Sequence, residues 1–387
     1  MGYHLLDVIA MGELEDGSIR VVFSKLDDPR IERSKKHKLI DIITIAICAV
    51  ICGADSWVDI AMFGESKKEW LSGFLELPNG IPSHDTFGDV FSRIDPVQFQ
   101  ECFMEWVRRV KELTRGQISI DGKTVRRSHD RFSGKEAIHM VSAWSSGNGV
   151  VLGQVKTSEK SNEITAIPEL LKLLDISGCI VSIDAMGCQK SISRDIVDKG
   201  ADYVLSLKQN QPGLHEDVKE LFDGAMQLGF DGIEYDTCET VGKEHGRIER
   251  RQCWAISDPQ SLQYLRGLSD WKGLNSVAMV RSERRIGDSV SVESRYYISS
   301  LRGDARRLLS AIRGHWGIEN SLHWVLDIAF REDDSRVRKD NAPENLAVIR
   351  HIALNLLKGE KSLKVGVNAK RKRAGWDTDY LLKVISI

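Results

Sequence analysis

The sequence predicts an α/β protein in which a small helical domain precedes an α/β domain that carries a β-rich insertion. Apolar residues recur at helical spacing through the first 110 residues, and after Gly116 the period changes toward two, which is typical of strands. Four further strand-like runs lie between about residues 231 and 300. We therefore expect a helical domain over residues 1–110 and an α/β domain over residues 111–387, with the insertion at about 231–300 and a basic helical tail at about 331–387.

Helical spacing in the N-terminal part is punctuated by prolines, which separate the expected helices. These helices are expected at residues 39–52, 57–63, 70–77 and 97–110, and Ser83 is a candidate N-cap for another. A cluster of cations at residues 30–38 precedes the first long helix. A helical domain with such a basic edge could hold DNA, although helical bundles without that role are equally common.

The order of elements after Gly116 indicates which strands are neighbours. We expect strands at residues 117–121, 137–145, 150–157, 179–184 and 203–207, and helices at 162–174, 189–199 and 211–228. Three strands followed by helix, strand, helix and strand is the succession of a ribonuclease-H-like domain, in which the first and fourth strands lie side by side. Asp121 and Asp184 end these two strands, so we expect both side chains to emerge together at one edge of the sheet.

Each of these aspartates also has a simpler interpretation. A strand-terminal aspartate is usually a turn residue whose side chain bonds its own backbone. At Asp121 the turn continues with Lys123, Arg126 and Arg127, and cations beside an acid suit a phosphodiester substrate. For Asp184 the turn interpretation loses weight only if the fold brings the two acids together.

A third acid, Glu319, lies in a segment with helical spacing. Arg313, Trp316, Glu319, His323 and Asp327 recur every three or four residues, so a helix would carry all five on roughly one face. Buried charge is costly unless it is paired or bound to metal, so this face is poor core material and suits a cleft. The alternative is a face of internally paired salt bridges.

Carboxylates that come from separate elements are what a two-metal phosphoryl-transfer site requires. Mg²⁺ prefers oxygen ligands, and two ions about 3.5–4 Å apart can stabilise both the attacking and the leaving oxygen. We therefore expect Asp121, Asp184 and Glu319 to bind two Mg²⁺ ions, with Mn²⁺ as a possible substitute. No phosphate-binding G-x-x-x-x-G-K-[ST] loop is present, so chemistry driven by a nucleotide is not expected.

Basic and polar residues outside the acids are candidates for DNA contact. Lys208 and Gln211 follow a strand and could reach a phosphate or a base, although Lys208 equally fits an ordinary surface lysine. In the insertion, Lys243, Arg247 and Arg250 gather around one turn between two expected strands, as in a basic β-ribbon or a hairpin that aids solubility. The densest basic block, residues 369–375, is expected to be a loop, either over nucleic acid or solvated.

Composition excludes several classes of protein. The net charge of −2 and the pI near 6.6 exclude a basic protein of the histone kind, but not local basic patches. The longest apolar stretch, residues 39–54, is too short to span a membrane, and the N-terminus lacks the pattern of a signal peptide. The seven cysteines form no CxxC pair, which favours free thiols in a reducing cytoplasm. We expect a cytoplasmic, nucleoid-associated protein.

At these residues the chain resembles the insertion-sequence transposases of the DDE class, and among them the H-repeat-associated proteins. The resemblance covers nearly the whole chain, through the segments ERSKKHKLIDIITIAICAVICGADSW, SHDTFGDVFSRID, IDGKTVRRS, KSNEITAIPELL, VSIDAMGCQK, DYVLSLKQNQ, HGRIERR and HWGIENSLHWVLDIAFREDDSR. It implies that Asp121, Asp184 and Glu319 form the DDE triad and hold two Mg²⁺ ions for nicking at element ends and for strand transfer. It also implies binding to double-stranded DNA, at element ends and target, by a homodimer or higher oligomer.

The glutamate segment departs from the broader group of transposases with a β-insertion. Their pattern has a tyrosine and an arginine before the glutamate and a lysine seven positions after it, where this chain has Ile312, His315 and Leu326. Arg313, Trp316 and His323 are candidates to replace those side chains. Two competing functions remain: a structure-specific, Mg²⁺-dependent nuclease that joins no ends, and a transposon-derived protein that binds DNA without catalysis.

Overall fold

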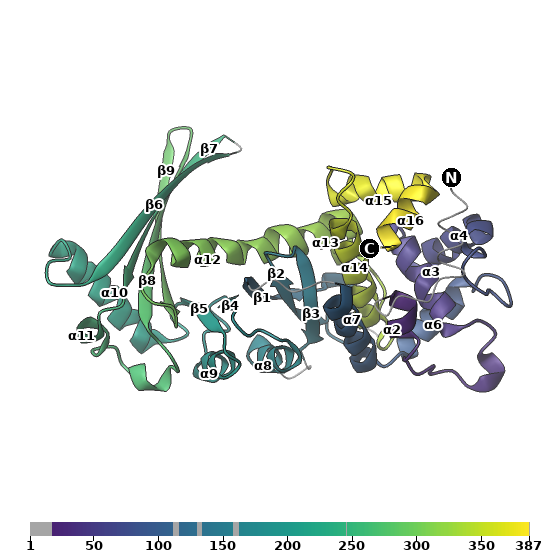
Figure 1. The fold of residues 1–387 in the computed structure, drawn as a ribbon, viewed down its shortest axis with the longest axis horizontal. Coiled ribbons are helices and arrows are strands. Elements are labelled where there is room, and N and C mark those ends of the chain that lie inside the picture. Colours follow the sequence, from purple (N-terminus) through teal and green to yellow (C-terminus); the bar gives the residue numbers. More distant parts are fainter. Residues whose placement is uncertain (1–17, 111–115, 130–133, 158–161, 245, 387) are drawn as a thin grey trace.

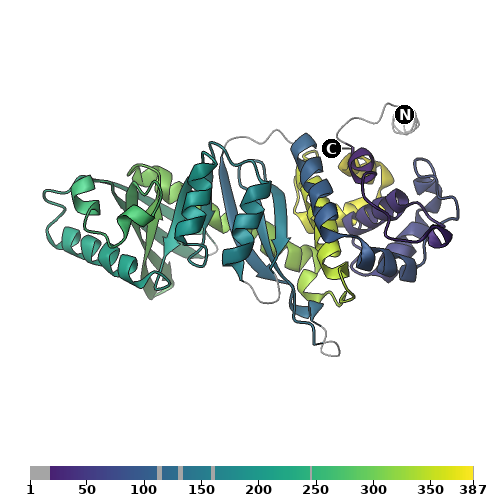
Figure 2. The ribbon, with the colours of Figure 1, turned by 90° about the horizontal axis from the view of Figure 1, so that it is seen from below.

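The structure is a computed structural model that describes residues 18–110, 116–129, 134–157, 162–244 and 246–386. It is elongated, with a cluster of helices at one end, a sheet in the middle, and a blade of four long strands at the other end (Figure 1, Figure 2). Within these ranges, no helix combines the length and the apolar character that crossing a bilayer would require. The seven cysteines are free thiols, as predicted.

The N-terminal helices form where the sequence has helical spacing. Their bounds are α2 Ile19–Phe23, η1 Glu32–Ser34, α3 Leu39–Ile51, α4 Trp57–Ser66, α5 Lys68–Leu71, α6 His84–Arg93 and α7 Pro96–Val110. Helix α3 is almost entirely buried, which explains its apolar sequence. The predicted N-cap is confirmed, because the Ser83 hydroxyl accepts a hydrogen bond from the Thr86 amide at the start of α6.

The C-terminal helices complete this helical end. They are α14 Ala342–Gly359, α15 Val367–Trp376 and α16 Thr378–Ile385, and all three contact α3, while α14 also packs against α6 and α7. The described N-terminal helices and the C-terminal helices therefore share one helical core. The prediction of a loop at residues 369–375 was wrong, because this block lies in α15 and buries Lys370 and Arg371.

Arg371 shows why a basic block can be buried. Its guanidinium donates hydrogen bonds to the carbonyl oxygens of Val50 and Ala329, stands 4.3 Å from the Phe330 ring centre, and pairs with Asp55 at 3.5 Å. The carbonyl of Val50 belongs to the last turn of α3, where the carbonyl groups have no partner inside the helix. Arg371 therefore fastens the tail to the N-terminal helices.

Replacing Arg371 by alanine should destabilise the protein by about 3–5 kcal/mol, because it leaves a partly buried carboxylate and several carbonyls without their cation. Urea unfolding measures this loss. The exposed neighbour Lys372 provides the control, since Lys372→Ala should change the free energy of unfolding by less than about 0.5 kcal/mol. Equal stabilities of the two variants would contradict the anchoring role.

Within the described ranges, nine strands form one sheet in the order β3-β2-β1-β4-β5-β9-β8-β7-β6. Their bounds are β1 Gln117–Thr124, β2 His139–Ser145, β3 Val150–Lys156, β4 Ile180–Ile183, β5 Asp202–Leu207, β6 Tyr235–Glu244, β7 Arg247–Ile256, β8 Ser276–Ile286 and β9 Ser289–Ser299. Strand β1 pairs antiparallel with β2 and parallel with β4, and β4 pairs parallel with β5. The predicted adjacency of the first and fourth strands is therefore confirmed.

Helices cover both faces of the central sheet. On one face lie α8 Glu163–Leu173 and α9 Lys190–Asp198, and on the other lies α12 Ala305–Ile318, which crosses β1, β2, β4 and β5 (Figure 1, Figure 2). Helix α12 continues through a π-helical turn, Glu319–His323, into α13 Trp324–Phe330. The remaining helices are α10 Pro212–Gln227 and α11 Pro259–Leu262, with short 3₁₀ turns η2 Arg126–Ser128, η3 Leu268–Asp270 and η5 Glu332–Asp334.

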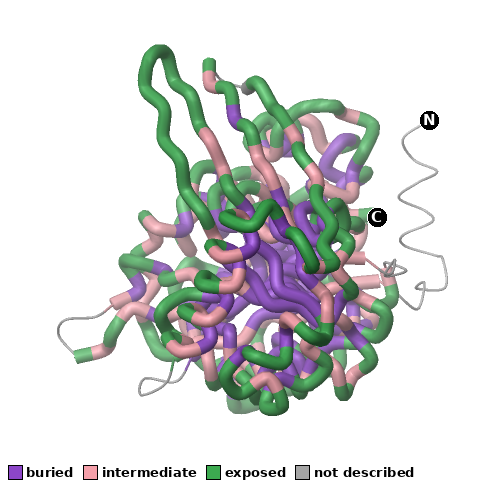
Figure 3. The backbone as a smooth tube through the Cα atoms, turned by 90° about the vertical axis from the view of Figure 1, so that its left-hand side faces the viewer, coloured by how far each residue is buried: buried purple, intermediate pink, exposed green. Residues whose placement is uncertain are grey.

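The β-rich insertion extends the central sheet. All four predicted runs form strands, and β9 pairs antiparallel with β5, so the sheet continues without a break from β5 into the blade. The inner halves of β7, β8 and β9 are buried, and the strands of the blade contact α10 and α12. The outer halves of the two hairpins project from the body and are largely exposed (Figure 3).

Candidate active site

Two of the three predicted acids stand at the same edge of the sheet. The parallel pairing of β1 with β4 ends at Ile120 and Ile183, and the next residue on one strand is Asp121 and on the other Asp184. Strand β1 runs on to Thr124, paired only with β2 on its other side. The two aspartates therefore lie next to each other at the point where β4 ends, as predicted. Beyond this point β1 has no partner strand on the side of β4, and we call this unpaired edge of β1 the opening.

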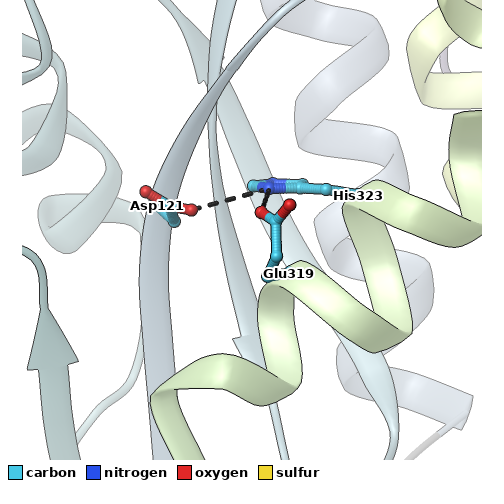
Figure 4. Close-up of side chains that lie close together, drawn as sticks. All are labelled: Asp121, Glu319 and His323. Atoms are coloured by element: carbon cyan, nitrogen blue, oxygen red, sulfur yellow. Dashed lines mark hydrogen bonds and ion pairs between the residues drawn. The ribbon is translucent and has the colours of Figure 1, made fainter. Parts of the chain in front are cut away.

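The third acid comes from the helix that crosses this opening. Glu319 begins the π-helical turn and His323 ends it, and the ligand atoms of Asp121, Glu319 and His323 lie within 4.8 Å of one another (Figure 4). Nδ1 of His323 is 3.2 Å from Oε2 of Glu319 and 3.5 Å from Oδ2 of Asp121. A π-helical turn is a local widening that often marks a functional site. Here it falls on the residues that meet the sheet.

All three acids line one pocket of about 330 Å³, together with Ser182, Lys208, Arg295, His315 and Trp316. The Trp316 ring is half exposed and lies 5.5 Å from the guanidinium carbon of Arg295. The pocket thus combines three acids with two cations and an indole. Such a lining suits an anionic, ring-bearing substrate that approaches a bound cation.

The negative charge of the site is poorly compensated. Burial, together with the charges of Asp184, Glu163 and Glu319, raises the pKa of Asp121 to about 7. A divalent cation would reverse this situation, because it favours the charged form of every carboxylate that binds it. Carboxylate oxygens are the ligands that Mg²⁺ and Mn²⁺ prefer, so the donor set can hold a divalent cation.

The two histidines of the site are set to remain neutral. Burial lowers the pKa of His323 and also that of His315, despite the carboxylates nearby. Nδ1 of His315 lies 3.2 Å from the Ser182 hydroxyl, while Nε2 of His323 is buried without a hydrogen-bond partner among the described residues. A neutral imidazole adds no charge to the site and can orient the carboxylates beside it.

Asp184 combines the two roles that its sequence position suggested. Its Oδ1 accepts hydrogen bonds from the amides of Met186, at 2.9 Å, and Gly187, at 3.4 Å. These bonds confirm the prediction that Asp184 is a turn residue whose side chain bonds the backbone that follows it. Asp184 also lines the pocket and acts electrostatically on Asp121, so its turn fixes the acid in place without removing it from the site.

Lys123 differs most from its prediction as a DNA contact. Its ammonium is largely buried and lies 2.8 Å from Asp327, 3.2 Å from Glu332 and 3.0 Å from Asp333. These acids follow Glu319 in the chain and pack against β1. Lys123 is therefore the central cation of an internal ion network. Asp327, which was predicted to face either a cleft or a salt bridge, forms a salt bridge.

The other residues predicted to contact DNA differ in how far they are exposed and in whether they already have partners within the protein. Arg126 and Arg127 are exposed at 79% and 49% and pair with Asp333 and Asp334 at the surface. Lys208 lines the pocket, whereas the side-chain amide of Gln211 donates to the Cys188 carbonyl and so holds the loop after β4. Arg313 is exposed on α12 and is not among the residues that line the pocket.

The blade separates its basic residues onto two faces. In β7, Cys253 packs in a core cluster with residues of α12, and Arg247, six residues earlier, shares that face because strand side chains alternate. Lys243 and Arg250 fall on the opposite face. Arg250 is also held by Glu239 through two hydrogen bonds of 2.7 and 2.8 Å. The predicted basic tip is therefore not one surface.

Ser182 and Arg295 also line the pocket, although neither was predicted as a site residue. Ser182 precedes Asp184 by two positions on β4, so the alternation of the strand already places it on the same face. Arg295 belongs to the inner part of β9 and reaches the pocket only because β9 pairs with β5. No local signal in the sequence marks that pairing.

Comparison with known proteins identifies the family of this chain. The family described as "Transposase DDE domain" matches residues 112–356, and the one described as "DDE_Tnp_1-associated" matches residues 21–107. The putative transposase YncI of Escherichia coli O157:H7 is 46% identical over 94% of this chain and 93% of its own length. The H repeat-associated putative transposase YhhI of Escherichia coli K12 is 42% identical over 94% of this chain and 96% of its own length.

Among solved structures, a piggyBac transposase synaptic complex with hairpin DNA aligns over 98% of this chain and 80% of its own, with a TM-score of 0.40 and 11% identity. The family match covers more than half of the chain and includes Asp121, Asp184 and Glu319. The chain therefore belongs to the family of DDE-domain transposases, alongside the H repeat-associated transposases of Escherichia coli.

Proposed function

We propose that this protein cuts DNA at the ends of an insertion element and joins the resulting 3′-hydroxyl ends to target DNA. The observation that carries the proposal is the convergence of Asp121, Asp184 and Glu319 on one pocket, from two neighbouring strands and a crossing helix. The order and pairing of β1 to β5 support a ribonuclease-H-like catalytic domain. Family membership supports a transposase over an unrelated nuclease.

The three acids would hold two Mg²⁺ ions, or Mn²⁺ in their place. When bound, such ions activate a water or a DNA 3′-hydroxyl and stabilise the leaving oxygen. Asp184 is fixed by the turn that it caps, and His323 orients Asp121 and Glu319 from a buried position. Imidazole nitrogen is a poorer ligand for Mg²⁺ than carboxylate oxygen, so we assign His323 this orienting role.

DNA would reach the acids over the side of the pocket that carries Lys208, Arg295 and Trp316. Their charges and the indole face suit phosphate contacts and base stacking. We propose that the helical domain, residues 1–110, helps to recognise the element ends and that residues 111–387 carry the chemistry. The protein would act as a homodimer or higher oligomer on DNA, in the cytoplasm at the nucleoid.

A joining assay tests this function. The substrate is taken from the DNA that flanks the reading frame, where terminal inverted repeats would define the ends, and is supplied both uncut and precleaved with a 3′-hydroxyl. We expect Mg²⁺-dependent nicking of the first and joining of the second to plasmid DNA. Nicking without joining would instead identify a nuclease, and DNA binding without metal-dependent turnover would identify a non-catalytic relative.

A further inference from the structure

A fourth carboxylate lies beside β1, one residue beyond Asp121. Gly122 has no side chain, and the space that a Cβ atom would need is filled by the carboxylate of Glu163 and the ring of His139. Any larger residue at position 122 would overlap with both groups. Glu163 is the first residue of α8, so it reaches β1 from the face of the sheet opposite to α12.

The opening in the sheet brings Glu163 to the same edge as the other acids. Strand β4 ends at Ile183, so the backbone of β1 from Asp121 onward has no strand on that side. The Glu163 carboxylate lies directly against the backbone of Gly122, the residue that follows Asp121. Glu163 therefore borders the opening from one face of the sheet, while Glu319 covers it from the other.

Glu163 is held in place by a chain of two hydrogen bonds. Its Oε1 lies 2.8 Å from Nε2 of His139, whose Nδ1 lies 2.8 Å from the Thr124 hydroxyl. With the Thr124 hydroxyl donating to Nδ1, the Nε2–H of His139 donates to the carboxylate. The side chain of Glu163 is 13% exposed, and its Oε2 has no hydrogen-bond partner among the residues that the structure describes.

Glu163 adds a fourth carboxylate beside Asp121, Asp184 and Glu319, and the neighbouring cation Lys123 is committed to Asp327, Glu332 and Asp333. Like charges at such short range repel one another when no cation lies between them. We propose that Glu163 is a fourth acidic residue of the catalytic site and helps to hold the divalent ion that binds beside Asp121. The inference rests on the proposed function only in its choice of ion. Gly122 provides the space for this carboxylate, and His139 and Thr124 fix its position.

Calorimetric titration of the full-length protein with Ca²⁺ tests this without requiring turnover. Glu163→Gln keeps the shape and the His139 contact but removes the charge, so we expect its Kd for Ca²⁺ to rise about tenfold or more. The Mg²⁺ concentration that gives half-maximal nicking should rise in parallel. Without metal, the melting temperature of Glu163→Gln should stay at or above that of the wild type, because a like charge has been removed.

Glu169→Gln is the matched control, since Glu169 lies on the same helix and is exposed. It should leave Ca²⁺ affinity unchanged. Gly122→Ala, which displaces Glu163 and His139, should weaken Ca²⁺ binding as Glu163→Gln does and gives a second route to the result. Unchanged Ca²⁺ affinity in Glu163→Gln would overturn the proposal.

The proposed function can fail separately from this inference. If the wild type binds Ca²⁺ through Glu163 but nicks no DNA, the four-acid site is supported and the proposed transposase activity is contradicted. If Glu163→Gln nicks and joins DNA with the same metal dependence as the wild type, the transposase activity is supported and the role of Glu163 as a fourth acid is contradicted.

Discussion

Replacing Asp121, Asp184 or Glu319 by alanine should abolish DNA cleavage, with a loss of roughly a thousandfold or more for each. A metal ion in such a site contributes several kcal/mol of charge stabilisation in the transition state, and each 1.36 kcal/mol corresponds to a factor of ten in rate. The three side chains line one pocket, so the loss of any one disturbs the same chemistry. Nicking of a labelled element end in Mg²⁺ measures the effect.

DNA affinity separates a chemical defect from a binding defect. Phosphate contacts made outside the acids position DNA, so all three variants should bind the element end within a few-fold of the wild type. Asp184→Asn sharpens the test, because asparagine retains the oxygen that caps the turn to Met186 and removes only the charge. Substantial Mg²⁺-dependent cleavage by any of these variants would contradict the assignment of the triad.

The sequence predicted the parts of the site that follow from strand periodicity and order. The period of two located β1 and β4, and the succession of strands and helices made them neighbours, which placed Asp121 beside Asp184. The helical spacing around Glu319 was also correct as an element. These features depend on local patterns or on a topology that such patterns specify.

Contacts between distant segments could not be predicted in this way. The contact of His323 with Asp121 depends on a π-helical turn, which a spacing of three or four residues does not reveal. Arg371 finds its carbonyl partner 321 residues earlier in the chain, and Lys123 finds Asp333 210 residues later. In each case a cation that was a candidate for DNA contact in the sequence forms hydrogen bonds or ion pairs inside the protein instead.

Lys123→Met should therefore destabilise the protein by about 3–5 kcal/mol, because it leaves the fully buried Glu332 without one of its two cations. Burial alone would raise the pKa of Glu332, but Lys123 and Arg350 hold it below its ordinary value. A carboxyl group with a lowered pKa in the folded state stabilises that state above its unfolded pKa and loses this contribution as the pH falls. The wild type should thus lose more stability than Lys123→Met between neutral and acidic pH, which urea unfolding at several pH values measures.

The alternative role of Lys123 makes the opposite prediction in every measurement. If its ammonium contacts phosphate, Lys123→Met should keep its stability and lower the salt dependence of DNA binding by about one unit of slope. The exposed Arg126 is the matched control for that behaviour, because its side chain is 79% exposed on the same turn. Adding Glu332→Gln to Lys123→Met should restore part of the lost stability, since it removes the charge that was left unpaired; no restoration would mean that Lys123 stabilises the fold by some means other than this ion network.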